Sequence, residues 1–191
     1  MPSTIKKKLI TLGWAVASLI LVFLITYVEN KEKALTDNSG QLSNNVSKFE
    51  YDQYDNQVVT ITRVVDGDTL YVSNKKIGEE KVRLIGINAP EIQHPTKGKE
   101  CFGDEAHIFA QKTYLGQEAT LTIDKSQDLR DRHERLLGYI SIDSNDIGHE
   151  LIRRGYAREY TYRSSYQNQE RYRDAEDNAQ QLNFGLWSCS E

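Results

Sequence analysis

Residues 63–91 carry an unusual density of side chains that could do chemistry. The stretch reads as two apolar runs of strand length joined by a polar loop, with polar residues at the rim of each run. Carboxylate and amide oxygens are the ligands that a hard cation prefers, and the planar fork of an arginine suits phosphate oxygens. We therefore predict a site for a cation and a phosphate group here. Its candidate members are Asp66, Asp68, Thr69, Arg83, Asn88 and Glu91.

The charge balance of the chain limits the kinds of partner it can have. The sequence contains 24 Lys and Arg against 28 Asp and Glu, which gives a formal net charge of −4 and a pI near 5.7. Proteins that coat nucleic acid by charge alone are usually strongly basic. If this chain meets nucleic acid, we expect a local positive site and not a global field.

The N-terminus has the pattern of a membrane anchor. Residues 9–28 carry no charge and follow three lysines at positions 6–8. A helix rising ~1.5 Å per residue would span the ~30 Å hydrocarbon core over this length. Because lysines favour the cytoplasmic side, we predict a cytoplasmic basic tip at 1–8, a transmembrane signal anchor at 9–28 and an extracytoplasmic remainder.

A cleaved signal peptide followed by secretion is the alternative interpretation of the N-terminus. The apolar region of such a peptide is roughly 7–15 residues long and ends in a small-x-small cleavage site. Here Ala15 and Ala17 lie in the middle of the run, and residues 25–29 make a poor cleavage site. The uncleaved anchor is therefore preferred.

The rest of the chain divides into a tether and a folded domain. Residues 29–56 are polar and lack periodicity, which predicts a flexible linker. We expect the domain at 57–191, with strands near 58–62, 70–72, 82–87, 119–123 and 136–140 and helices near 104–115, 145–154 and 168–181. This order predicts an α+β fold, a five-stranded OB-fold barrel with about three packed helices. The apolar stripe predicted for the last helix consists of Tyr172, Ala175, Ala179 and Leu182.

The two cysteines, Cys101 and Cys189, are compatible with one disulfide in an oxidising compartment. The alternative is a pair of unrelated free thiols. Export across the membrane favours the bridge, which would tie the C-terminal tail to the body of the domain.

Several motifs in their order and spacing resemble the staphylococcal nuclease (thermonuclease) family, across about residues 57–190. A single motif of this kind would be weak, whereas the ordered set is specific. The motifs are Asp66-Gly67-Asp68-Thr69, Arg83 to Glu91, His94-Pro95, Cys101 to Ala106, Arg135 to Tyr139, Leu151 to Ala157 and Leu186-Trp187-Ser188.

The resemblance implies a Ca²⁺-dependent phosphodiesterase that acts on single- and double-stranded DNA and on RNA with little sequence preference. It implies cleavage of the P–O5′ bond with 3′-phosphate products. No obligate protein partner is evident, so we expect a monomer. Besides nucleic acid, we expect it to contact the membrane through its N-terminal helix. The residue types agree with this activity. A phosphodiesterase site must offset the negative charge of the phosphate, orient a water molecule and stabilise the negative charge that develops in the transition state.

The resemblance also assigns roles by position. The metal ligands would be Asp68, Asn88 and the backbone carbonyl of Ala89, with Asp66 and Thr69 supporting them. Glu91 aligns with the proposed general base, and Arg83 and Arg135 align with the arginines that grip phosphate. The expected nucleic-acid contacts are His133, Tyr160, Tyr162 and Lys97.

Two positions depart from the better-known family pattern. Asn88 stands where an aspartate is usual, which keeps an oxygen ligand but removes a negative charge and should weaken Ca²⁺ binding. Glu134 precedes Arg135 and adds a negative charge beside the expected phosphate site.

Two other classes of protein compete with the enzyme. A catalytically silent nucleic-acid or protein-binding module of the same fold would typically have lost the arginines, Asp68 or Glu91, and this chain keeps them all. A purely structural anchor protein would leave these residues unexplained. Each residue alone could have a purely structural role, such as a tight turn at Asp66 and Asp68. Their joint occurrence favours the enzyme.

Overall fold

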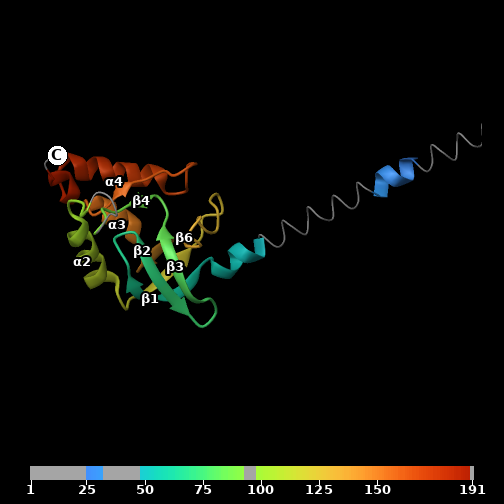
Figure 1. Cartoon of the computed structure of the whole chain (residues 1–191), viewed down its shortest axis with the longest axis horizontal. Helices are drawn as coiled ribbons and strands as arrows, with labels where there is room; N and C mark the ends of the chain where they lie inside the picture. Colours follow the sequence, from blue (N-terminus) through green and yellow to red (C-terminus); the bar gives the residue numbers. More distant parts are fainter. Residues whose placement is uncertain (1–24, 32–47, 93–97, 190–191) are drawn as a thin grey trace, which may run out of the picture. The chain divides into compact units, whose positions relative to one another are not determined.

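A closed β-barrel forms the centre of the structure, a computed structural model that describes residues 25–31, 48–92 and 98–189. Adjacent strands are antiparallel in the order β3-β2-β1-β5-β6, and a parallel pairing of β3 with β6 closes the barrel (Figure 1). The predicted α+β fold on a five-stranded barrel is confirmed. The strands are β1 (Gln57–Val64), β2 (Thr69–Asn74), β3 (Gly78–Leu84), β5 (Glu118–Thr122) and β6 (Leu136–Ile142).

Alternating residues of these strands fill the barrel. Val59 and Ile61 on β1, Val72 on β2 and Val82 on β3 are buried, while their sequence neighbours on each strand are more exposed. This period of two places one set of side chains in the core and the other on the outer surface. The outward set of β3 includes Arg83, which lines the candidate site.

Three helices pack on the barrel, as predicted. They are α2 (Gly103–Tyr114), α3 (Ile147–Arg153) and α4 (Gln169–Gln181), and α3 contacts both α4 and β6 (Figure 1). The expected start of the second helix at residue 145 is too early, because Asn145 belongs to β7 (Asn145–Asp146) and the Asp146 carboxylate caps α3 by accepting the His149 N–H.

The apolar stripe of α4 is shorter than predicted. Tyr172, Ala175 and Ala179 are buried in the core, as expected, whereas Leu182 lies beyond the last helical residue and is 61% exposed. Helical spacing alone therefore extended the stripe past the point where the helix ends.

A sharp turn separates β3 from a short strand, β4 (Ile87–Asn88), which pairs with β8 (Arg158–Glu159). The predicted strand at 82–87 thus breaks after Leu84, because Gly86 has φ +79°. A Cβ at Gly86 would lie 2.4 Å from the Tyr166 ring, so only glycine allows this close approach. The turn is what carries Asn88 and Ala89 to the rim of the barrel.

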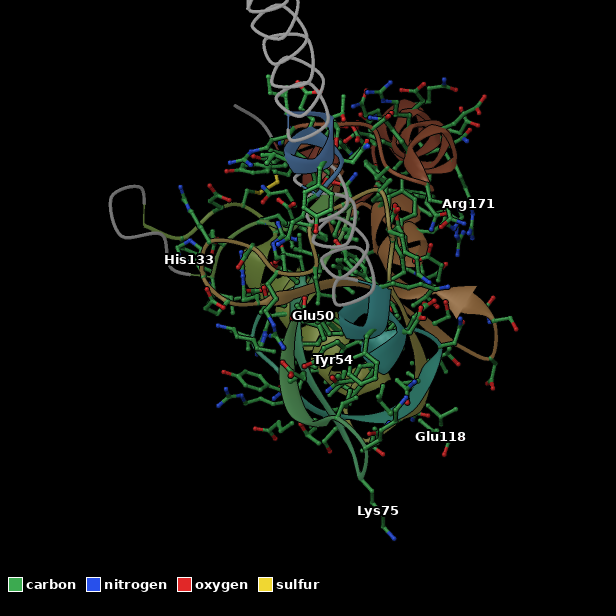
Figure 2. All side chains as sticks on the ribbon, turned by 90° about the vertical axis from the view of Figure 1, so that its right-hand side faces the viewer. Glu50, Tyr54, Lys75, Glu118, His133 and Arg171 are labelled. Carbon is green, nitrogen blue, oxygen red and sulfur yellow. A yellow bond between two sulfur atoms is a disulfide. The ribbon has the colours of Figure 1, made fainter. Side chains whose placement is uncertain are left out.

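Residues 48–54 form a helical segment at the entrance to β1. The Tyr51 hydroxyl donates to the Gln127 carbonyl at 2.8 Å, and the Asp55 carboxylate accepts the Ile123 N–H at 2.9 Å. Figure 2 shows Tyr54 on this segment beside the barrel wall. The compact unit accordingly begins at Glu50, N-terminal of the first strand.

Most of the remaining N-terminal predictions lie outside the described residues, including the basic tip at 1–8, the anchor up to residue 24 and positions 32–47. Residues 25–31 are helical. Within the described ranges, no helix combines the length and apolar character needed for a membrane span.

The predicted disulfide is present. Cys101 and Cys189 are bonded across 88 positions of sequence and join the start of α2 to the end of the 3-10 helix η1 (Gly185–Ser188). The C-terminal turn is thereby fixed to the side of the domain that carries α2.

Removing this bridge should lower the melting temperature of the domain while the native fold is retained. A cross-link over a loop of this length stabilises by roughly 4–5 kcal/mol in the chain-entropy model, before native strain is subtracted. We expect Cys101→Ser/Cys189→Ser to melt at a lower temperature than wild type, as measured by circular dichroism. Reductant should lower the wild-type melting temperature and leave that of the double variant unchanged. Equal melting temperatures for the two proteins would contradict the stabilising role.

Candidate active site

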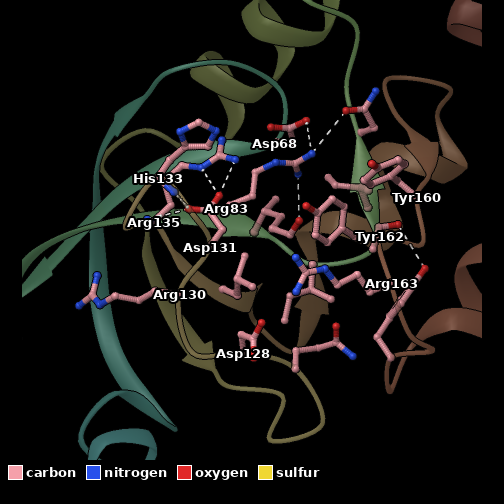
Figure 3. A pocket seen from close by; sticks show the side chains of 18 of the residues that line it. Asp68, Arg83, Asp128, Arg130, Asp131, His133, Arg135, Tyr160, Tyr162 and Arg163 are labelled. Atoms are coloured by element: carbon pink, nitrogen blue, oxygen red, sulfur yellow. Dashed lines mark hydrogen bonds and ion pairs between the residues drawn. The ribbon is translucent and has the colours of Figure 1, made fainter.

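A cleft of about 580 Å³ opens where the ends of β2, β3 and β4 meet two later segments of the chain. One wall is the loop 126–135 and the other is the segment 160–166, so three distant parts of the sequence face one another (Figure 3). Of the residues predicted for the site, the cleft is lined by Asp66, Asp68, Arg83, Asn88, Glu91, His133, Arg135, Tyr160 and Tyr162.

Asp68 bonds to residues of β2, of β3 and of the turn at β4. Its buried carboxylate accepts the Thr69 hydroxyl at 3.0 Å and the Ala89 N–H at 2.9 Å, and it pairs with Arg83 at 3.2 Å. The backbone carbonyl of Asp68 accepts the Leu84 N–H. Asp68 therefore joins β2 to both β3 and the β4 turn, and its carboxylate has a fixed direction.

Arg83 lies between two oxygen-bearing side chains. Its Nη2 is 3.2 Å from Asp68 Oδ2 and 3.4 Å from Asn88 Oδ1, while Nη1 donates to the Leu84 carbonyl at 3.0 Å. Figure 3 shows these contacts as dashed lines that fan out from the guanidinium. The oxygen of Asp68, just before β2, and the oxygen of Asn88, on β4, thus both contact the same guanidinium nitrogen of Arg83.

Arg135 reaches the same place from the opposite side of the barrel seam. Its Nε and Nη2 contact Asp131 Oδ2 at 2.8 and 2.7 Å, and its Nη1 donates to the Thr69 hydroxyl at 3.3 Å. Since Thr69 in turn donates to Asp68, one hydroxyl bridges the two halves of the site. The two arginines thereby belong to a single hydrogen-bonded network.

Asp131 is a site residue that the sequence did not reveal. Both backbone N–H groups of His133 and Arg135 donate to its Oδ1, at 2.8 and 3.0 Å. Burial alone would raise the pKa of Asp131, but the hydrogen bonds from the Arg135 side chain and from these N–H groups outweigh it and lower the pKa. An ionised Asp131 therefore holds Arg135 in a defined orientation.

The loop that presents Arg135 is itself fastened to the barrel. Arg130 makes two hydrogen bonds to the Glu80 carboxylate at 2.8 and 2.9 Å and a third to the Tyr54 hydroxyl at 3.0 Å. Figure 3 shows Arg130 directed away from Arg83. Arg130 serves to anchor the loop, whereas Arg135, from the same run of charges, faces the site.

Asp66 stands behind Asp68 and supports it. Its Oδ1 accepts the Asp68 N–H at 3.0 Å. Burial, followed by the neighbouring Asp68 carboxylate, raises the pKa of Asp66 to about 7. Two carboxylates this close repel each other, and a nearby cation favours their ionised forms.

Glu91 is exposed at the rim of the cleft. Its backbone N–H donates to the Glu100 carboxylate at 3.0 Å and its carbonyl accepts the Glu100 N–H at 3.1 Å. No ion pair joins the Glu91 carboxylate to another of the described residues. Its backbone is fixed while its side chain stays open to solvent, which suits a group that exchanges protons with water.

Aromatic side chains line the opposite wall. Tyr160 and Tyr162 are 45% and 62% exposed, and their ring centroids are 6.3 Å apart, so both predicted tyrosines face the cleft. Gly86 accepts the Tyr160 N–H at 2.9 Å, which ties this wall to the β4 turn. Lys97, predicted as a further contact, lies outside the described residues.

Several residues change the electrostatics expected from the sequence. Arg132 and Arg163 line the cleft although neither belongs to a motif recognised in the sequence, and the Arg163 guanidinium carbon lies 5.2 Å from the Tyr162 ring centroid. His133 accepts a hydrogen bond from Arg132 at 3.1 Å. Glu134 is exposed and is not among the residues that line the cleft, and the predicted effect of its charge on phosphate binding stays a prediction.

The donor set around Asp68 fits a hard cation of the Ca²⁺ type. Asp68 Oδ2 and Asn88 Oδ1 both contact Arg83 Nη2, and the Ala89 carbonyl belongs to the same turn, so a cation bound by these oxygens would take the place of the guanidinium beside them. Ca²⁺ binds such mixtures of carboxylate, amide and backbone oxygens together with water. Among the described residues no group of three or more His, Cys, Asp or Glu side chains forms a metal cluster, and this set does not need one.

Comparison with known proteins agrees with this geometry. Residues 81–189 match the family described as "Staphylococcal nuclease homologue". The chain is 33% identical over 132 residues to a thermonuclease of Staphylococcus hyicus, which covers 69% of this chain and 76% of that protein. It is 26% identical to endonuclease YncB of Bacillus subtilis (strain 168) over an aligned length of 201 residues, 97% of this chain and 93% of that protein. The family match spans more than half of the chain, and we conclude that this protein belongs to the staphylococcal nuclease family.

Proposed function

We propose that the protein is a Ca²⁺-dependent phosphodiesterase that hydrolyses DNA and RNA with little sequence preference. The observation that carries this proposal is the single network in which Thr69 links the Asp68 carboxylate to Arg135, with Arg83 on the other side of Asp68. The guanidiniums of Arg83 and Arg135 can bind a phosphate, and the oxygens of Asp68 and Asn88 beside them can bind a cation.

Arg83 and Arg135 bind the non-bridging oxygens of the scissile phosphate in this proposal. Both guanidiniums have a carboxylate partner in the structure, so a phosphate takes over part of the role of Asp68 and Asp131. Donors that are already oriented stabilise the charge that develops in the transition state without reorganising. This is the main contribution that the two arginines make to the rate.

Glu91 acts as the general base. Its carboxylate removes a proton from a water molecule, and the water oxygen forms a bond to phosphorus as the P–O5′ bond breaks. The leaving 5′ oxygen takes a proton from solvent, which leaves a 3′-phosphate and a 5′-hydroxyl. The exposure of Glu91 at the rim of the cleft gives it access to that water.

A bound Ca²⁺ would be held by Asp68, Asn88 and the Ala89 carbonyl, and its charge would polarise the phosphate. Asp66 Oδ1 accepts the Asp68 backbone N–H, and the Thr69 hydroxyl donates to Asp68 Oδ1, so both the backbone and the carboxylate of Asp68 are held in place. Tyr160, Tyr162 and His133 would contact the bases or sugars. Aromatic faces accept any base, which agrees with low sequence preference.

The disulfide supports an extracytoplasmic location, because such bonds persist in oxidising compartments. We propose a membrane-anchored nuclease whose domain lies outside the cytoplasm, with secretion after signal cleavage as the other possibility. A silent binding module is less well supported, since Asp68, Arg83, Glu91 and Arg135 all line the same cleft.

The proposal is tested by incubating the full chain with single-stranded DNA in Ca²⁺ and in chelator. We expect cleavage only with Ca²⁺, and Glu91→Gln should lower kcat by about 10²- to 10⁴-fold, the usual contribution of a general base. Circular dichroism should show that the variant folds. Glu105→Gln, an exposed carboxylate in the first turn of α2, is the matched control. Absence of Ca²⁺-dependent cleavage in wild type would refute the proposal.

Asn88→Asp should tighten Ca²⁺ binding. The substitution adds a negative charge at an oxygen that already faces the proposed cation, and we expect the Kd to fall by about tenfold or more. Calorimetric titration of wild type and variant with CaCl₂ measures this change. A weaker affinity in the variant would show that Asn88 is not a ligand.

Asp131→Asn should lower activity through Arg135. The variant keeps the shape of the side chain but loses the ion pair that orients the guanidinium, and we expect kcat/KM to fall by about 10- to 100-fold. The matched control is Asp177→Asn on the exposed face of α4, which makes the same chemical change far along the chain. An activity equal to that of the control would mean that Asp131 does not position Arg135.

A further inference from the structure

A row of outward-facing side chains leads from Arg135 across the outer surface of the barrel. Arg135 precedes Leu136, the parallel partner of Val82, and Lys81 precedes Val82. Lys81 is the cross-strand partner of Tyr71, and Tyr71 is the partner of Arg63. Their neighbours Val64, Leu70, Val72, Val82 and Leu136 are buried, so the row lies on the opposite face of the sheet.

Tyr71 holds the two cations of this row in place. The Arg63 guanidinium carbon lies 3.7 Å from the centroid of the Tyr71 ring, and Lys81 Nζ lies 5.9 Å from it. A ring flanked by cations from both neighbouring strands gathers positive charge at the centre of the row. We call Arg63, Tyr71 and Lys81 the outer track.

The cations of the outer track form no ion pair within the part of the chain that the structure describes. Neither Arg63 nor Lys81 takes part in an ion pair with any of the described residues, whereas Arg83, Arg130 and Arg135 do. An exposed cation–π contact is worth only about 0.5–1 kcal/mol, which is a weak reason to place two cations together. In a chain of net charge −4, an unneutralised pair beside the cleft is a local anion site.

The track also has the size and the border of a binding site for a strand. Strands lie ~4.8 Å apart, so β1 to β3 spans about 10 Å, and a stacked nucleic-acid strand advances ~3.4 Å per nucleotide. The row therefore covers about three nucleotides. Glu79, two residues before Lys81 on the same face of β3, accepts a hydrogen bond from Thr62 and bounds the track with negative charge.

We propose that Arg63 and Lys81, held by Tyr71, bind the phosphates of nucleotides that flank the scissile phosphate outside the cleft. The track rests on the proposed function for the identity of its ligand, a single-stranded polynucleotide. It adds a binding surface that lies beyond Arg135 and contributes affinity for long substrates without touching the reacting atoms.

The test measures binding and cleavage separately on the full chain. Fluorescence anisotropy in chelator follows a labelled 12-nucleotide single-stranded DNA and a labelled dinucleotide at several salt concentrations. For Arg63→Gln/Lys81→Gln, the loss of two contacts should lower the slope of log K against log salt by about 1.4. Affinity for the 12-mer should fall about 10- to 100-fold at about 50 mM salt, while affinity for the dinucleotide stays at the wild-type value.

Lys75→Gln/Lys76→Gln is the matched control, because it removes the same charge at the β2–β3 turn. Figure 2 shows Lys75 at the tip of that turn, well away from His133. This control should bind both DNAs as wild type does. Tyr71→Phe should retain 12-mer binding because the ring remains, and Tyr71→Ser should weaken it.

The outcomes separate the track from the proposed function. A 12-mer affinity in Arg63→Gln/Lys81→Gln equal to that of wild type, an equal loss in the lysine control, or an equal loss for the dinucleotide would each overturn the track. Failure of wild type to bind the 12-mer would also overturn it. Failure to cleave DNA in Ca²⁺, with the expected binding pattern intact, would instead reject the proposed function and leave the track standing.

Discussion

The parallel pairing of β3 with β6 is the constraint on which the site depends. It places Val82 opposite Leu136 and Arg83 opposite Leu137, so the barrel seam runs directly beneath both site arginines. On its other side β6 packs closely on β5, where a Cβ at Gly138 would lie 2.9 Å from Leu121 Cδ1 and 3.0 Å from the Thr122 carbonyl. Without the seam, Arg135 would remain on a surface loop and Arg83 on a strand edge, and neither could act with the other.

Each arginine at the seam is balanced by a carboxylate before substrate arrives. Arg83 pairs with Asp68 and Arg135 with Asp131, at 3.2 and 2.7 Å. In our proposal, a cation would bind Asp68 and a phosphate would bind the two arginines, so each charged group would keep a partner of opposite charge. The same balance is compatible with polyanion binding by an acidic protein. Asp68 and Asp131 also accept hydrogen bonds from neutral donors, so they keep partners when a phosphate binds the arginines.

The sequence predicted the barrel, its helices and the residues that gather in the cleft, because apolar alternation and ordered motifs are local signals. It predicted the disulfide from the presence of two cysteines in a chain expected to be exported. It did not predict Asp131, whose role depends on a turn that folds its carboxylate back on Arg135. It also missed the capping of α3 by Asp146 and the contacts of residues 48–54, which depend on groups distant in the sequence. Leu182 was misassigned because helical spacing does not show where a helix ends.

The central claim is that Arg83 and Arg135 act on one phosphate beside a cation held by Asp68. The most direct measurement is a crystal structure of the Glu91→Gln variant with Ca²⁺ and a dinucleotide. We expect both guanidiniums to contact the bridging phosphate and Ca²⁺ to be bound by Asp68, Asn88 and the Ala89 carbonyl. A phosphate bound by only one of the arginines, or a Ca²⁺ ion away from Asp68, would contradict it.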